Sequence, residues 1–200
     1  GVFIEKIPLR YQLAESKHPY QVCLDRQQQI TGSYSSGTGL TTWTSTLPHA
    51  SLAKVVLSTD FPTGTEGESP IITYGGDTTT LTASGDYSAG VAIRGIPFSQ
   101  EVQLSKLYMR DPQNTARTMT TGRFQLKRFH VNYQSSGFFN VSITPAYRTE
   151  QVFTFNGRVV GSGDNIIGSP AIHSGQYSIP IQTEASTATI KIKNSTELPM

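Results

Sequence analysis

The sequence predicts an all-β protein made of antiparallel, β-sandwich-like sheets, and three observations lead to this class. Charged residues make up only 15% of the 200-residue chain, whereas Thr (25 residues) and Ser (21 residues) are abundant. Helical bundles need far more Glu, Lys, Ala and Leu. Apolar and polar residues alternate with period 2 in many short runs, and no run keeps a 3.6-residue period over three turns. Clusters of Gly, Pro, Asn, Asp and Ser separate these runs, as turns separate strands.

The expected strands fall into two kinds. The runs Val55–Leu57 and Val91–Ile93 are apolar throughout, which indicates strands covered on both faces. The later runs alternate, so each is expected to bury one face and to expose the other. Their buried positions are Val102 and Leu104; Phe139, Val141 and Ile143; Phe153 and Phe155; Tyr177 and Ile179; and Ile190 and Ile192.

One strand, over residues 122–133, changes phase. Its apolar residues occupy even positions first (Phe124, Leu126) and odd positions later (Phe129, Val131, Tyr133). A regular strand with one buried face cannot do this, because side chains alternate with a period of 2. Two explanations remain open: a β-bulge near Lys127-Arg128, or a strand that is partly buried on both faces.

Turn residues lie between the expected strands and fix the connections. Asn156-Gly157 predicts a type I′ hairpin that joins residues 152–155 to a strand over residues 158–160. Other turns are expected at Gly75-Gly76-Asp77, Ser84-Gly85-Asp86, Ser135-Ser136-Gly137 and Ser174-Gly175. Two longer stretches, residues 61–70 and 111–121, predict loops, and loops of this length are usually functional or lie at interfaces.

The sequence leaves open whether the chain has one domain or two. In the second case, residues 32–97 form a small β module inserted into a main antiparallel β domain made of residues 1–31 and 98–200. The first residue is not Met and the last three follow a strand-like run, so we expect the chain to be a fragment of a longer polypeptide.

The residues that carry chemistry do not form a recognisable site. The single cysteine, Cys23, excludes an intramolecular disulfide framework and a multi-thiolate zinc site, and is expected to be a small buried hydrophobe. The four histidines lie far apart at His18, His49, His130 and His173. The available acids, which a glycosidase would need as a pair, are mostly in turns: Glu66, Glu68, Asp77, Asp86, Glu150 and Asp164. The sequence therefore predicts no enzyme, cofactor or metal site.

Charge and hydropathy exclude further classes. The net charge is +2 with scattered Lys and Arg, so no basic patch for specific nucleic-acid binding is expected. No apolar run reaches the length of about 20 residues that a membrane-spanning helix needs. Residues 161–168 are Gly-rich, but no helical pattern follows them to bind a dinucleotide. Basic and aromatic residues interleave over Arg123–Tyr133, and strand alternation predicts that the aromatic rings face the core and the cations face outward.

Several segments together resemble the tail tubular protein B, or tail nozzle protein, family of short-tailed bacteriophages. The segments are short, but they are spread over nearly the whole chain. They are Glu5-Lys6, Leu24-Asp25-Arg26, Thr42-Trp43-Thr44 before Leu47-Pro48, Phe61–Gly67, Gly95–Phe98, Gly122–Arg128 and Val131–Phe139.

The resemblance implies a structural protein of the virion tail. Members of that family form a hexameric ring below the portal and adaptor rings, line the channel through which genomic DNA leaves without sequence-specific contacts, and offer surfaces to tail fibres. Ring subunits use heterologous interfaces, so the long loops are the expected subunit or fibre contacts. The candidate interface residues are Thr63, Glu66, Glu68, Asp77, Asp111, Asn114 and Arg117. We also expect deletion of residues 111–121 to spare the fold and weaken assembly.

The alternative function is a carbohydrate- or receptor-binding β module of a phage tail. It requires an exposed aromatic platform, for which Trp43 and Tyr34 are the candidate residues. A glycosidase is the third class, and it would release reducing ends from host polysaccharide.

Overall fold

The computed structural model describes residues 21–48, 52–106, 108–111, 117–119, 124–163 and 165–200. Within these residues the chain has strands and no helix, and every strand pair is antiparallel, which confirms the predicted fold class. The chain's internal contacts divide it into two compact units. Unit 1 comprises Gly1–Phe98, Arg158–Ile172 and Ser195–Pro199, and unit 2 comprises Ser99–Gly157, His173–Asn194 and Met200.

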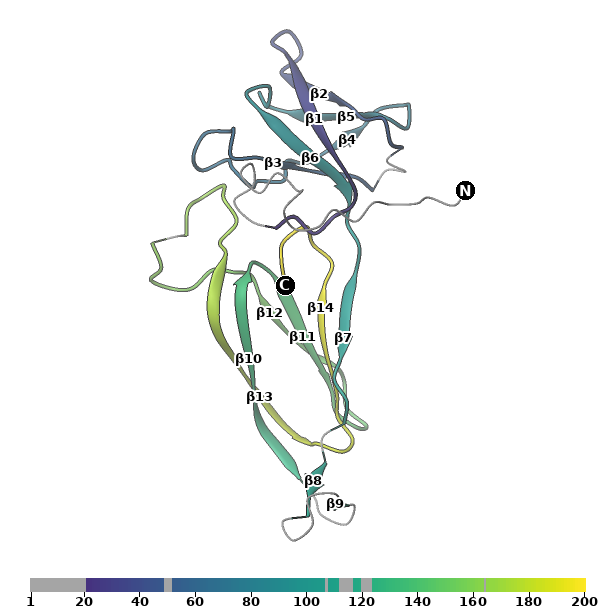
Figure 1. Cartoon of the computed structure of the whole chain (residues 1–200), viewed down its shortest axis with the longest axis vertical. Helices are drawn as coiled ribbons and strands as arrows, with labels where there is room; N and C mark the ends of the chain where they lie inside the picture. Colours follow the sequence, from purple (N-terminus) through teal and green to yellow (C-terminus); the bar gives the residue numbers. More distant parts are fainter. Residues whose placement is uncertain (1–20, 49–51, 107, 112–116, 120–123, 164) are drawn as a thin grey trace. The chain divides into compact units, whose positions relative to one another are not determined.

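Unit 1 is a curled half-barrel of six strands with the order β3-β6-β1-β2-β5-β4 (Figure 1). The strands are β1 (Asp25–Ser35), β2 (Leu40–Thr44), β3 (Lys54–Leu57), β4 (Thr73–Tyr74), β5 (Thr80–Ser84) and β6 (Val91–Ile96). The first part of β1, up to Thr31, pairs with β6, and the part from Gly32 onward pairs with β2. At Gly32 a Cβ would lie 2.6 Å from Thr41 Cγ2 and 2.8 Å from Trp43 Nε1, so only glycine fits where the strand changes partner.

The core of unit 1 lies on both sides of β3 and β6. Val55 and Leu57 belong to a cluster with Trp43, and Val56 belongs to a second cluster with Ile93 on the other face. All three β3 residues are fully buried. The prediction of strands covered on both faces is therefore confirmed, since each face of the sheet has its own apolar layer.

Unit 2 is a sandwich of a four-stranded sheet, with the order β12-β11-β14-β7, and a two-stranded sheet of β10 and β13. Its strands are β7 (Gln100–Gln103), β10 (Gln125–Ser136), β11 (Phe139–Thr144), β12 (Gln151–Phe155), β13 (His173–Glu184) and β14 (Thr189–Asn194). The separate ribbon of β8 (Met109–Arg110) and β9 (Thr118–Met119) is two-stranded. Phe139, Val141, Ile143, Ile179 and Ile190 form the core between the two sheets, as their alternation predicts.

The strand over residues 122–133 has a register irregularity at the position predicted for the bulge, but the extra residue is on its partner strand. The pairing of β10 with β13 shifts between Leu126 and Arg128, whose partners are Thr183 and Pro180. The partner strand advances three residues while β10 advances two, so the extra residue belongs to β13, where Gln182 has a φ of 49°. Lys127 and Arg128 are both exposed, which rules out a β10 buried on both faces there.

Two predicted turns are wrong. Residues 158–160 form no strand, because the chain leaves the sandwich after Gly157, at a φ of 74°, and residues 158–172 belong to unit 1. Ser174 and Gly175 lie inside β13 rather than in a turn. A Cβ at Gly175 would lie 3.1 Å from the hydroxyl of Tyr133, so this glycine makes room for the cross-strand ring.

The two predicted loops differ in character. Residues 61–70 contain no strand, as expected. Residues 111–121 include β9, so the described part of this segment belongs to a two-stranded ribbon and not to an open loop; residues 112–116, 120 and 121 lie outside the described residues. The inserted module over residues 32–97 stays a prediction: the unit boundary at Phe98 lies beside its end, whereas β1 runs across its start.

Candidate functional site

The most distinctive surface of unit 1 consists of two loops, residues 61–70 and 158–168, that lie against each other. Ser169 Oγ donates a hydrogen bond of 3.2 Å to the carbonyl of Glu66. Gly168 has a φ of 89°, and a Cβ there would lie only 2.2 Å from the carbonyl oxygen of Gly64. Both its conformation and this close backbone contact require glycine.

The first loop is held by its own backbone and by β3. The Leu57 amide donates to the Glu68 carbonyl and the Gly67 amide donates to the Leu57 carbonyl, each at 2.9 Å. Thr65 Oγ1 donates to the Pro62 carbonyl at 2.8 Å, and the Phe61 side chain is buried in the core. The loop is therefore a fixed surface feature despite having no strand.

The second loop exposes large apolar side chains. Val160 and Ile167 are almost fully exposed, at 103% and 91%, and Val159 and Ile166 are about half exposed. The amide of Ser162 donates to the Val159 carbonyl at 3.1 Å, and Asn165 Nδ2 donates to the same oxygen at 2.7 Å, which closes the loop. We call Val159, Val160, Ile166 and Ile167 the apolar loop surface. Exposed apolar groups gathered in this way mark interaction sites.

The predicted interface residues are distributed over both units. Thr63, Glu66 and Glu68 lie on the first loop, next to the apolar loop surface. Asp77 lies in the β4–β5 turn, where its carboxylate accepts hydrogen bonds from the amides of Thr79 and Thr80. Such a bonding pattern is that of an Asx turn, so this carboxylate shapes the backbone.

The remaining predicted interface residues belong to unit 2. Asp111 and Arg117 flank the ribbon, where the Asp111 amide donates to the Arg117 carbonyl at 3.0 Å. Asn114 lies outside the described residues. Sequence reasoning missed the apolar loop surface, although the pairs Val159-Val160 and Ile166-Ile167, set between glycines, were a visible signal.

Groups suited to catalysis are not gathered in the described part of the chain. No three His, Cys, Asp or Glu side chains there come together as a metal site. His130 is exposed on β10, and His173 begins β13 with a buried Nε2 that has no hydrogen-bond partner among the described residues. His18, His49 and Asp164 lie outside the described residues. Among the acids, Asp86 accepts hydrogen bonds from Ser88, which lower the pKa of its carboxyl.

Two side-chain placements differ from the predictions. Cys23 is half-buried and not buried, because its neighbours Val22 and Leu24 take the inward positions. Trp43 is fully buried and stacks on Tyr87 with the ring centroids 5.9 Å apart, so it cannot form an exposed sugar-binding platform. Tyr34 is 38% exposed, so it is the one candidate ring of the two that reaches the surface. The prediction of an exposed platform made of both rings is therefore wrong.

A buried cation is another feature that the sequence did not signal. Arg94 on β6 is fully buried, and its guanidinium donates to the carbonyls of Pro48 at 2.8 Å and Arg26 at 3.4 Å. Burial, and then the charge of Arg26, lower its pKa. The hydrogen bonds compensate for the burial of the charge and link β6 to two other backbone segments, which indicates a structural role for Arg94.

The interleaved basic and aromatic stretch follows strand alternation as predicted. On β10, Lys127, Arg128 and His130 are exposed, whereas Phe129 and Tyr133 pack against the core of unit 2. Arg123 lies outside the described residues, as do Glu5-Lys6 and Gly122 of the segments that carry the family resemblance. In the described part of the chain there is also no helix that could cross a lipid bilayer.

Comparison with protein families identifies a family to which the chain is similar. The model of the family described as bacteriophage nozzle protein matches residues 1–200, which is the whole chain. No curated protein matches it.

Proposed function

We propose an assembly role for this chain, which belongs to the bacteriophage nozzle protein family and is therefore a structural component of the virion tail. In this proposal the chain is part of a nozzle subunit that forms a hexameric ring with copies of itself. The ring encloses the channel through which the genome is ejected, contacts the tail adaptor and the tail fibres, and makes no sequence-specific contact with the passing DNA.

The observation that carries the proposal is the apolar loop surface of unit 1. Val160 and Ile167 expose nearly their whole side chains to solvent. A monomeric protein gains nothing from such exposure, whereas a subunit interface buries it at roughly 25 cal/mol per Å². The loop that carries these residues is fixed against residues 61–70, so the surface is organised before a partner binds.

The charges nearby support a contact between different surfaces of neighbouring copies. Glu66 lies on the loop that contacts Ile166 and Ser169, and a closed ring places unlike surfaces of adjacent subunits face to face. Carboxylates at the rim of an apolar patch select the partner and its orientation more than they add affinity.

The test is a pair of matched substitutions in the intact nozzle polypeptide. Val160→Asp with Ile167→Asp places two charges in the proposed contact, and Val152→Asp places one on β12, where Val152 is 56% exposed. We expect the first variant to remain folded by circular dichroism and to lose the six-fold rings that electron micrographs and light scattering detect. The Val152→Asp control is expected to keep them. Rings that form normally in the first variant would contradict this contact.

Deletion of residues 111–121 tests whether unit 2 also contributes a contact to assembly. It removes β9 and the hydrogen bond between Asp111 and Arg117, neither of which touches the sandwich core. We expect the shortened protein to keep its circular dichroism spectrum and to join complete tails less well; normal tails would limit the contacts to unit 1.

A further inference from the structure

We propose that unit 2 of one copy joins unit 2 of the next copy in the ring, with β12 of the first adding to the free edge of β7 of the second. The four-stranded sheet then continues from one subunit into its neighbour. This contact presupposes the ring proposed above and is separate from the apolar loop surface, because both of its sides belong to unit 2.

The four-stranded sheet of unit 2 has two open edges. Among the described strands, β12 pairs only with β11, and β7 pairs only with β14. In unit 1, by contrast, the edge of β3 is covered, since the Leu57 amide and carbonyl both bond to the backbone of residues 67–68. Open edges attract further strands unless charges, prolines or a covering loop block them. β12 contains no charge and no proline, and the one charge of β7, Glu101, is bound by Lys191 and Lys193.

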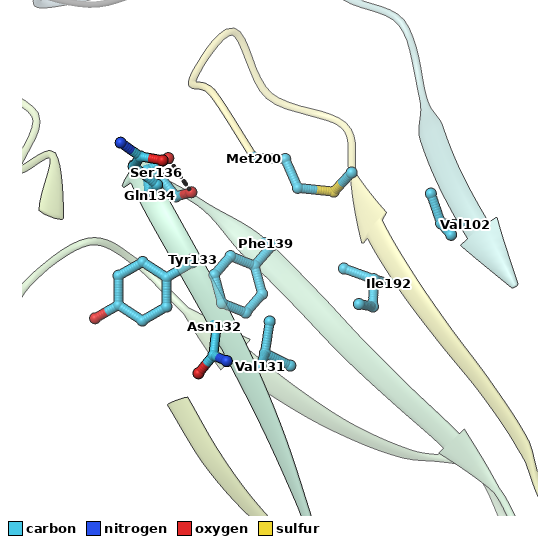
Figure 2. A pocket seen from close by; sticks show the side chains of 9 residues that line it. All are labelled: Val102, Val131, Asn132, Tyr133, Gln134, Ser136, Phe139, Ile192 and Met200. Atoms are coloured by element: carbon cyan, nitrogen blue, oxygen red, sulfur yellow. Dashed lines mark hydrogen bonds between the residues drawn. The ribbon is translucent and has the colours of Figure 1, made fainter. Parts of the chain in front are cut away.

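The two edges carry complementary apolar groups. A hollow of about 220 Å³ borders the β7 edge, between Val102 of β7 and the β10 residues Val131 and Tyr133 (Figure 2). Val102 is 47% exposed there. Sites for small molecules usually measure about 300–1,000 Å³, so this hollow suits an apolar side chain better than a ligand. At the opposite edge of the sheet, Phe153 of β12 packs on the core and is only half-buried.

The directions of the edge strands fit a contact between copies. Three antiparallel pairings separate β12 from β7, so the two strands run in opposite directions. The rotation that relates the copies of a ring preserves the direction of each strand along the axis and the face of the sheet that looks toward it. β12 of one copy therefore lies antiparallel to β7 of its neighbour, as in every other pair of this sheet. Unlike edges that match in this way close a ring, whereas like edges pair only two copies.

The faces and lengths of the two strands fix the register. The residues that face away from the core are Val152 and Thr154 on β12, and Glu101 and Gln103 on β7, because they align with the outward residues of β11 and β14. Only one register matches the faces and pairs all four residues of β7. It sets Thr154 opposite Glu101 and Phe153 opposite Val102, so the half-buried ring meets the hollow.

Two groups at the β12 edge remain compatible with this contact. The Tyr177 hydroxyl of β13 donates a 3.3 Å hydrogen bond to the Thr154 carbonyl. A carbonyl oxygen can accept two hydrogen bonds, so this bond holds β13 over β12 without blocking the edge. The Val152 side chain stays on the solvent face of the extended sheet, so Val152→Asp remains a valid control for ring assembly.

Disulfide crosslinking in the assembled ring tests the contact. In the intact nozzle polypeptide with Cys23→Ser, Thr154→Cys is combined with Glu101→Cys. The control combines Thr154→Cys with Lys193→Cys, because Lys193 pairs with Glu101 and lies one strand farther from the edge. Strands lie about 5 Å apart, so the control position is about 10 Å from β12 of the next copy, beyond the roughly 7 Å limit for a disulfide. Within one chain, β12 and β7 are three strand spacings apart, about 15 Å, so the test disulfide can form only between copies.

We expect the test pair to give a ladder of linked subunits on a denaturing gel, and the control to give several-fold less. Rings in electron micrographs without this ladder, or an equal ladder in the control, would overturn the contact and leave the ring itself standing. Dimers from either single-cysteine variant would overturn it too, because like edges would then be paired. Absence of rings from the parent polypeptide would overturn the assembly role and this contact with it.

A charge in the hollow provides a second measurement that needs no cysteine. Val102→Asp sets a carboxylate opposite Phe153 and is expected to lower the fraction of assembled rings several-fold at the same protein concentration. Val152→Asp, at a valine of similar exposure on the outer face, is the matched control and is expected to leave this fraction unchanged. Circular dichroism checks that both variants are folded. Equal assembly of the two variants would overturn the proposal.

Discussion

The two units bury their strands in different ways. In unit 1, β3 is covered on both faces, with Val55 and Leu57 against one apolar cluster and Val56 against another. In unit 2, each sheet turns one face toward a shared core, as Val141 and Ile179 do, and leaves the other face more polar. Unit 1 thus has a layered core, and unit 2 has a single one.

The second layer of unit 1 comes from distant parts of the sequence. Val22 and Leu24 precede the sheet, whereas Ile172 and Leu198 follow it by many residues. Lys54 on β3 forms a 2.6 Å ion pair with Glu197 in this layer. Unit 2 also pairs strands that are distant in the sequence, since only β11–β12 joins consecutive strands within its sandwich, but its strands share one core and need no second layer. The comparison teaches that a fully buried strand here depends on long-range closure.

The strongest test of this comparison is Trp43→Ala, which removes the largest fully buried side chain of unit 1. We expect a loss of about 3–5 kcal/mol in the free energy of unfolding, as for other buried Trp and Phe truncations. Urea unfolding followed by circular dichroism measures it, and hydrogen exchange shows whether the loss is confined to unit 1. Tyr34→Ala, at a side chain that is 38% exposed, is the control and should change stability by about 0.5 kcal/mol or less. Equal losses in the two variants would show that the core is not centred on Trp43.

Gly168→Ala tests the long-range closure at a surface loop. A left-handed φ and a Cβ placed 2.2 Å from the Gly64 carbonyl make alanine strained there, at a cost of about 1–3 kcal/mol. We expect faster proteolysis within residues 158–168 and a lower unfolding midpoint. Gly163→Ala on the same loop meets no atom within 4 Å and is the matched control. If both variants are cleaved at the same rate, the two loops are not held together as described.

The sequence predicted unit 2 in more detail than unit 1. Period-2 alternation located β11, β12, β13 and β14, because a strand with one buried face has apolar residues at every second position. The phase change in β10 located the register irregularity. The apolar runs located β3 and β6, but not what covers their second face, since residues 21–24 and 195–199 carry no periodic signal of their own. Long-range closure is a property of the folded chain that a local pattern does not encode.

The errors in prediction have the same origin. Asn156-Gly157 has the chemistry of a hairpin turn, and Gly157 does adopt a positive φ, yet the chain crosses to the other unit instead of returning. Gly175 resembles a turn residue, yet it serves the ring of Tyr133 inside a strand. Of the candidate interface, the loop with Glu66 was predicted and the apolar loop surface was not. The two lie together only in the folded chain, because they come from segments 103 residues apart.

The smallest expected effect compares one ion pair from each unit. On unit 2, Glu101 pairs with Lys191 Nζ at 2.7 Å and Lys193 Nζ at 3.5 Å, and the hydrogen bond from Lys191, followed by the lysine charges, lowers the pKa of its carboxyl. A lowered folded-state pKa stabilises the fold above the unfolded value of about 4.3 and loses this effect as the pH falls through the folded value.

Glu101→Gln is therefore expected to lower the unfolding midpoint slightly at pH 7 and to match the parent at a pH below the folded value. The difference should also shrink in about 1 M salt, because exposed charges are screened. Glu197→Gln breaks the pair with Lys54 in unit 1, where the Glu197 side chain is only 12% exposed, so its effect should be larger and should persist in salt. Thermal unfolding of both variants at two pH values and two salt concentrations measures this order. A larger effect for Glu101→Gln would mean that the second layer of unit 1 is not closed by its ion pair, and that apolar packing alone covers the outer face of β3.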